Sequence, residues 1–109
     1  MESCIFCKIR DGEIPKEFTY QDEHVMVFPD IHPLKPVHLL VVPKEHIGDF
    51  LNLKDNALSN HLRDVVRKMV KEQKLENKGY RVTINGGGYQ IVDHLHIHIL
   101  GPLGTNQKI

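Results

Sequence analysis

Neither sign of charge dominates this sequence, because its 14 lysine and arginine residues balance its 14 aspartate and glutamate residues. Proteins that bind nucleic acid through its phosphate backbone present a basic field, and this chain has none. We therefore expect no nucleic-acid partner. The balance of charge still allows a small phosphorylated ligand.

Long apolar runs and cysteines are equally scarce. No run approaches the roughly 20 residues of a membrane-spanning helix, and Met1–Cys4 do not form a basic region followed by an apolar stretch. Both features predict a cytoplasmic protein with no membrane partner. The cysteines, Cys4 and Cys7, form a C-x-x-C pair, which suits reduced thiols or a bound metal better than a secreted disulfide framework.

The length of the chain, 109 residues, allows one hydrophobic core and is too short for two, which predicts a single domain over residues 1–109. One long helix is expected within Leu53–Glu76, where apolar residues recur at three- and four-residue spacing. Asp55 or Asn56 can cap the start of this helix.

Runs of β-branched and aromatic residues predict strands on both sides of the long helix. The other expected elements are a short helix over Cys4–Ile9 and strands over Phe18–Tyr20, Val25–Phe28, His38–Val42, Tyr80–Ile84 and Asp93–Leu100. This order predicts an α+β fold with a five-stranded antiparallel sheet. The long helix covers one face of the sheet only, and the apolar area left uncovered favours a homodimer.

The most informative stretch is the last expected strand, which holds His94, His96 and His98. These histidines alternate with leucine and isoleucine, and strict alternation is typical of a strand that buries one face. The pattern predicts that the imidazoles point the same way, about 6.6–6.8 Å apart, so that one small charged ligand can lie across them. A packing role explains one histidine more readily than three, because titratable rings resist being desolvated together.

This H-x-H-x-H run, with Gly86–Gly88 before it and Gly101 after it, resembles the motif of the histidine-triad (HIT) family of nucleotide-binding proteins. The resemblance covers nearly the whole chain and implies the HIT-like fold, a homodimer with joined sheets and a small-molecule nucleotide substrate. It also implies that His96 attacks phosphorus, while His98 and His38 neutralise phosphoryl charge or assist the leaving group. Which ring donates a proton stays open at this stage.

The same resemblance implies a set of nucleotide contacts. Asp30 matches an acidic residue that accepts hydrogen bonds from the ribose hydroxyls, and a turn-stabilising role is the alternative. Asn85 and Gln90 match positions beside the phosphate. Gly86–Gly88 can bring amide groups to an anion or simply make a tight turn. The implied apolar slot for the base, whose members could equally be ordinary core, comprises Ile5, Phe6, Ile9, Phe28 and Ile31.

Cys4 and Cys7 have the spacing of half a tetrahedral zinc site, and His46 and His94 are the candidates to complete it. HIT-family members with this C-x-x-C pair hold a structural zinc through two cysteines and two histidines at corresponding positions. The resemblance therefore implies a closed zinc site, which leaves no position for water and has a structural role. The alternative is that both cysteines are small buried hydrophobic residues.

The resemblance, together with these features, implies a hydrolase that attacks the α-phosphate of nucleoside phosphoramidates or related nucleotide derivatives through a covalent nucleotidyl-His96 intermediate. The alternatives are a dinucleoside polyphosphate hydrolase of the same family and a zinc-stabilised nucleotide-binding or interaction module with little turnover. Many family members have a glycine before the glutamine and a polar residue, often serine, after it, where this chain has Tyr89 and Ile91. Ile91 cannot donate the hydrogen bond that a hydroxyl donates.

Overall fold

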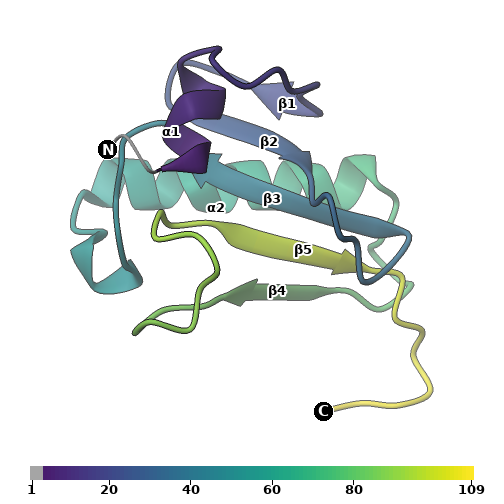
Figure 1. The fold of residues 1–109 in the computed structure, drawn as a ribbon. Coiled ribbons are helices and arrows are strands. Elements are labelled where there is room, and N and C mark those ends of the chain that lie inside the picture. The colour runs from purple at the N-terminus through teal and green to yellow at the C-terminus, as the bar shows by residue number, and fades with distance from the viewer. Residues whose placement is uncertain (1–3) are drawn as a thin grey trace.

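The computed structural model describes residues 4–109 as one antiparallel sheet with helices on both faces (Figure 1). The helices are α1 (Ile5–Arg10), the short 3-10 helix η1 (Phe50–Asn52) and the long helix α2 (Asn56–Glu72). The strands are β1 (Tyr20–Gln21), β2 (Val25–Pro29), β3 (Val37–Pro43), β4 (Arg81–Ile84) and β5 (Ile97–Gly101). The predicted α+β fold with five antiparallel strands and one long helix is confirmed.

The strand order β1-β2-β3-β5-β4 places β3 and β5 side by side in the sheet, although they lie far apart in the chain. In their antiparallel register His38 pairs with Leu100 and Leu40 pairs with His98. His38 and His98 are therefore diagonal neighbours on the same face. This pairing brings the histidine after the proline-rich loop next to the last histidine of the H-x-H-x-H run.

Helix α2 lies behind the sheet in Figure 1 and buries its apolar stripe against it. The buried residues of that stripe are Leu62, Val65, Val66, Met69 and Val70. Asp55 is the N-cap, since its Oδ1 accepts a hydrogen bond from the backbone N–H of Leu58 at 3.1 Å. The helix is shorter than the predicted Leu53–Glu76, because η1 precedes it and Gln73 caps its end.

Helix α1 covers part of the opposite face of the sheet (Figure 1). Phe6, Cys7 and Ile9 are buried against a second apolar cluster that includes Met26 and Phe28 of β2. The expected uncovered face therefore needs correction: the end of the sheet near β2 and β3 is covered by α1. Among residues 4–109, no helix is both long and apolar enough to cross a membrane.

The bounds of two predicted strands need correction. The expected strand Phe18–Tyr20 shares only Tyr20 with β1, which comprises Tyr20 and Gln21. The histidine strand begins only at Ile97, because the N–H of Leu95 bonds to the carbonyl of Ile47 at 2.6 Å rather than to a neighbouring strand. His94 and His96 therefore precede β5, and the three histidines do not share one regular strand.

Candidate active site and metal cluster

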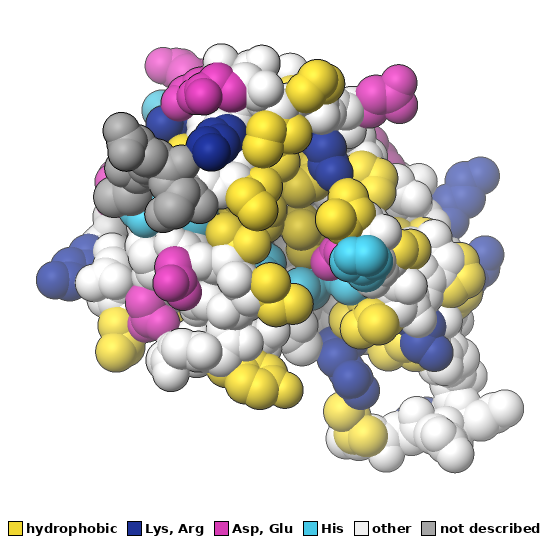
Figure 2. Space-filling view, viewed as in Figure 1, with side chains coloured by type: hydrophobic (Ala, Val, Ile, Leu, Met, Phe, Trp, Pro, Cys, Tyr) yellow, Lys and Arg dark blue, Asp and Glu magenta, His cyan; other side chains and the backbone are white. Residues whose placement is uncertain are grey.

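A pocket of about 350 Å³ opens beside α1 on the face of the sheet that this helix covers. Figure 2 shows apolar side chains gathered in this hollow, with histidines and an acidic side chain at one edge. The predicted site residues that line it are Ile5, Phe6, Ile9, Phe28, Asp30, Ile31, Asn85, His96 and His98. The fold thus brings together predicted residues from four separate stretches of the sequence.

Two predicted site residues lie outside this lining. His38 is buried behind His98, to which it is hydrogen bonded. The side-chain amide of Gln90 donates to the carbonyl oxygen of Gly48, and Gln90 does not line the pocket. The lining residues that sequence reasoning missed are Lys16, Pro29, His32, Leu40 and Val92. Pro29 and His32 flank Asp30 and Ile31 and could have been found by adjacency, whereas no spacing signals Lys16.

His96 is held in one tautomer. Its Nδ1 lies 2.8 Å from the backbone carbonyl oxygen of His94, and a carbonyl oxygen can only accept. The neutral ring therefore carries its proton on Nδ1 and keeps the lone pair of Nε2 free. The ring of Phe6 packs edge-on against that of His96, with 5.1 Å between centroids, which further restricts its orientation. The arrangement gives His96 the state that a nucleophilic imidazole needs.

A second chain of hydrogen bonds fixes the protons of His38 and His98. The backbone N–H of Leu34 donates to Nδ1 of His38 at 3.1 Å, so neutral His38 carries its proton on Nε2. That Nε2 lies 2.9 Å from Nδ1 of His98 and 3.4 Å from Oδ2 of Asp30. When Nε2 of His38 donates to His98, Nδ1 of His98 is the acceptor. The proton of the neutral His98 ring then resides on its Nε2. His98 is thereby equipped to donate from Nε2.

Burial lowers the pKa of His98 to about 4, and repulsion by His96 and His38 adds to this effect. The ring is therefore neutral at pH 7, which agrees with its role as acceptor and donor in the chain of hydrogen bonds. Its centroid lies 4.9 Å from that of His96. The rings of His96 and His98 thus present an unprotonated nitrogen and a protonated one side by side at the pocket.

Acid should destabilise the fold through His98. In the unfolded chain its pKa is near the ordinary 6.5 and in the folded chain about 4, so the unfolded state binds more protons between these pH values. The free energy of unfolding should therefore fall as the pH drops from about 6.5 to about 4. Urea unfolding across this range should show a shallower fall for His98→Gln than for the wild-type chain. Identical pH dependence of the two would contradict the buried neutral state of this ring.

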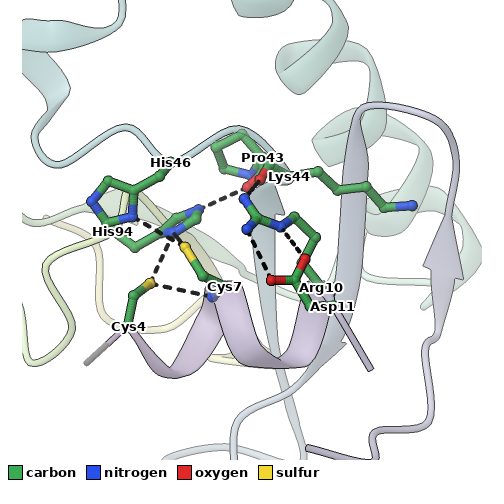
Figure 3. Close-up of polar contacts among 8 residues, drawn as sticks. All are labelled: Cys4, Cys7, Arg10, Asp11, Pro43, Lys44, His46 and His94. Carbon is green, nitrogen blue, oxygen red and sulfur yellow. Dashed lines mark hydrogen bonds and ion pairs between the residues drawn. The ribbon is translucent and has the colours of Figure 1, made fainter. Parts of the chain in front are cut away.

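Four possible metal ligands converge beside the pocket: the Sγ atoms of Cys4 and Cys7 and a ring nitrogen each of His46 and His94, all within 4.8 Å of one another (Figure 3). Nδ1 of His94 lies 3.3 Å from the sulfur of Cys4 and 3.6 Å from that of Cys7. Nδ1 of His46 lies 3.3 Å from the sulfur of Cys7. Cys4 caps α1, Cys7 lies in its first turn, and the histidines follow β3 and precede β5.

The chemistry of this cluster fits a zinc ion. Nε2 of His94 donates to the carbonyl oxygen of Pro43 at 2.8 Å, which leaves the lone pair of Nδ1 directed at the sulfurs. Burial lowers the pKa of His94 to about 4 and keeps the ring neutral, as a metal ligand must be. Burial and the neighbouring Cys4 raise the pKa of the Cys7 thiol to about 11. This disfavours the thiolate, and a bound cation offsets the effect. Two sulfurs and two imidazole nitrogens are the ligands of structural zinc.

The metal cluster and the pocket share one short segment. His94 directs its ring to the cysteines while its carbonyl oxygen accepts the Nδ1–H of His96. Phe6, which lies between the two cysteines in sequence, packs edge-on against both histidine rings, with centroid distances of 5.7 Å to His94 and 5.1 Å to His96. Any change in how His94 is held therefore reaches the ring of His96 directly.

The glycine loop forms a turn away from the pocket. Gly87 and Gly88 have positive φ values of 64° and 90°, which only glycine adopts without strain. The N–H of Gly87 donates to Oδ1 of Asp49 at 2.7 Å, so this amide is already bonded within the chain. Of the two alternatives for Gly86–Gly88, the tight turn is the one that the structure shows.

Comparisons with known proteins agree with this geometry. A family model described as "Scavenger mRNA decapping enzyme C-term binding" matches residues 3–108. An uncharacterized HIT-like protein of Methanocaldococcus jannaschii is 43% identical over 99 residues, which cover 89% of this chain and 77% of that protein. The adenosine 5'-monophosphoramidase HNT1 of Candida albicans is 41% identical over 106 residues, which cover 90% of this chain and 69% of that enzyme.

Comparison with solved structures finds proteins of the same kind. An HIT family hydrolase from Legionella pneumophila matches with a TM-score of 0.85 and 38% identity, over 91% of this chain and 92% of its own. A histidine triad protein from Clostridium difficile matches with a TM-score of 0.85 and 39% identity, over 100% of this chain and 96% of its own. The chain belongs to the histidine-triad (HIT) family, which includes hydrolases and nucleotide-binding proteins.

Proposed function

We propose that this chain, as a single HIT domain over residues 1–109, hydrolyses nucleoside phosphoramidates or related nucleotide derivatives at the α-phosphate, with His96 as the nucleophile. The observation that carries the proposal is the tautomer of His96, whose Nδ1–H is bonded to the carbonyl of His94 while the ring lines the pocket. The relative named as an adenosine 5'-monophosphoramidase supports this choice of substrate.

The reaction proceeds in two displacements. Nε2 of His96 attacks the α-phosphorus, and the bond from phosphorus to the leaving nitrogen breaks as the new bond forms. His98 donates its Nε2 proton to the departing nitrogen, which leaves as an amine, while the hydrogen-bonded pair of His38 and His98 takes up one proton from solvent and stays neutral. Water then attacks the phosphorus of the adduct and gives a proton to Nε2 of His98. The bond from phosphorus to His96 breaks, the mononucleotide is released, and the pair returns one proton to solvent.

The remaining lining residues bind the nucleotide. The base occupies the apolar slot formed with Phe6 and Phe28, whose ring centroids lie 5.6 Å apart in an edge-on contact. Asp30 accepts hydrogen bonds from the ribose hydroxyls. Its Oδ1 also accepts the backbone N–H of His32 at 2.9 Å, so the carboxylate stabilises its own turn as well. The contact and turn roles of Asp30 are therefore compatible.

In this proposal the zinc ion has a structural role and not a catalytic one. Cys4, Cys7, His46 and His94 would hold it, and the closed ligand set supplies a cross-link rather than a reactive water. It would join α1 to the segments after β3 and before β5. Because His94 also bonds to His96, the cross-link would keep the nucleophile in position.

A homodimer formed through β4 is part of the same proposal. This strand is at the edge of the sheet and exposes the apolar side chains of Val82 and Ile84, with Tyr80 beside them. An exposed apolar edge strand is a surface on which another strand can pair. A second copy of the chain would extend the sheet there.

The test of the proposed function compares two substrate types. Purified protein should release mononucleotide from a nucleoside 5'-phosphoramidate faster than from a dinucleoside polyphosphate. The reverse order would transfer the assignment to polyphosphate hydrolysis. Tight mononucleotide binding with no turnover of either substrate would favour the alternative of a nucleotide-binding module. Ile91 on the pocket wall is the observation behind this alternative, because its side chain has no hydrogen-bond donor.

Ile91 should limit the rate. The residue is 99% exposed, and its side chain lines the pocket without a hydrogen-bond donor. A hydrogen bond to a charged group contributes about 1.5–3 kcal/mol, so Ile91→Ser should raise kcat with a phosphoramidate by about 10- to 100-fold. Ile91→Val, which adds no donor, should leave kcat unchanged. An equal rise in both variants would mean that side-chain size, rather than the missing hydroxyl, sets the rate.

A further inference from the structure

We propose that Lys16 recognises the base of the bound nucleotide and makes the pocket selective for 6-oxopurines. This inference rests on the proposed function, because it assigns the substrate class of the same site. Lys16 lines the pocket and is half-buried. It is the only lysine or arginine among the described residues that line it.

The ammonium lies at the apolar end of the pocket. Nζ of Lys16 is 5.1 Å from the centroid of the Phe28 ring. The histidine end is formed by His96 and His98, with Asp30 close to the pair of His98 and His38. A nucleotide with its phosphate at the histidines and its ribose at Asp30 therefore extends its base toward Phe28 and Lys16.

Packing on both sides holds the backbone of Lys16 beside this end. Ile14 and Phe18, two residues before and after it, are partly buried against the apolar cluster under α1. The ring of Phe18 packs edge-on against that of Phe28, with 6.2 Å between centroids. The side chain at position 16 thus begins at a fixed point on the pocket wall.

The ammonium has hydrogen-bonding capacity to spare. Within residues 4–109, the side chain of Lys16 takes part in none of the ion pairs or hydrogen bonds, and its contact is with the face of Phe28. Three N–H donors beside an otherwise apolar slot require acceptors from a ligand or from water. A base that enters the slot can supply these acceptors from its edge.

The edge chemistry of the bases selects among them. A 6-oxopurine presents O6 and N7 as adjacent acceptors, the pair that lysine binds in nucleic-acid recognition. Adenine presents N7 next to an amino group, which is a donor and cannot bond to an ammonium. Guanine and hypoxanthine therefore satisfy Lys16 better than adenine does.

Calorimetric titration with GMP, IMP and AMP tests the inference. The wild-type chain should bind GMP and IMP about tenfold more tightly than AMP. Lys16→Met should weaken GMP and IMP by about tenfold and leave AMP within about twofold, whereas Lys16→Arg should keep the preference. Lys8→Met, which removes a lysine on α1 that does not line the pocket, should change none of the three.

Equal weakening of all three nucleotides by Lys16→Met would overturn the inference, because the ammonium would then act on the phosphate. Equal affinity of the wild-type chain for the three, together with normal phosphoramidate turnover, would overturn it while leaving the proposed function intact. If the wild-type chain bound none of them and showed no turnover, the proposed function would fail and this inference with it.

Discussion

Replacing His96 with alanine should reduce turnover of a nucleoside phosphoramidate by at least about 10⁴-fold, because the variant lacks the atom that forms the bond to phosphorus. Binding of a mononucleotide should be affected far less, since the apolar slot and Asp30 remain. Steady-state kinetics give the first quantity and calorimetric titration the second. This separation of rate from binding is what a nucleophile predicts and a binding residue does not.

The matched control for this variant is His24→Ala, which removes an exposed imidazole that does not line the pocket. It should leave both turnover and binding unchanged. A loss of only about tenfold for His96→Ala would show that another group attacks phosphorus or that water attacks directly. The covalent mechanism would then be wrong, whatever the structure of the pocket.

Replacing Cys7 should have the largest effect on stability. Structural zinc contributes roughly 10–16 kcal/mol of apparent binding free energy, comparable with the whole stability of a small domain. Cys7→Ala should therefore lose bound zinc and lower Tm by about 15 °C or more. Elemental analysis of never-chelated protein should give about one equivalent of zinc in the wild-type chain and less than about half in the variant.

Cys7→Ala and Cys7→Ser together separate the metal site from ordinary packing. If Cys7 is only a small buried hydrophobic residue, alanine should be tolerated and serine should cost more, because it buries a hydroxyl. If the thiolate binds zinc, both variants should lose the metal, and their Tm values should fall by similar amounts. Near-normal Tm in Cys7→Ala, with no zinc in the wild-type chain, would contradict the zinc site.

Much of the fold could be predicted from local patterns. The three- and four-residue apolar spacing found α2, and β-branched runs found β2 and β3, because each depends on residues near one another in sequence. The ends of the helices and strands were less predictable. The strand of His94 and His96 was drawn too long, since the bond from Leu95 to the carbonyl of Ile47 comes from a distant segment.

The candidate site divides in the same way, into residues that local sequence patterns predict and features that depend on distant segments. Residue types and spacing located the histidines and cysteines, and the resemblance to the HIT family connected them. The protonation pattern depends on the N–H of Leu34 and the carbonyl of His94, which are backbone groups that carry no sequence signal. Lys16 was missed for a related reason, because only the packing of its neighbours brings it to the pocket.

The central claim is that Nε2 of His96 bonds covalently to the phosphorus of the substrate. Rapid quenching of a phosphoramidate reaction, followed by proteolysis and mass spectrometry, tests it most directly. We expect a nucleotidyl group on the peptide that contains His96, formed and lost at rates compatible with turnover and absent in His96→Ala. An active enzyme that carries the group on another residue, or on none at any quench time, would contradict the claim.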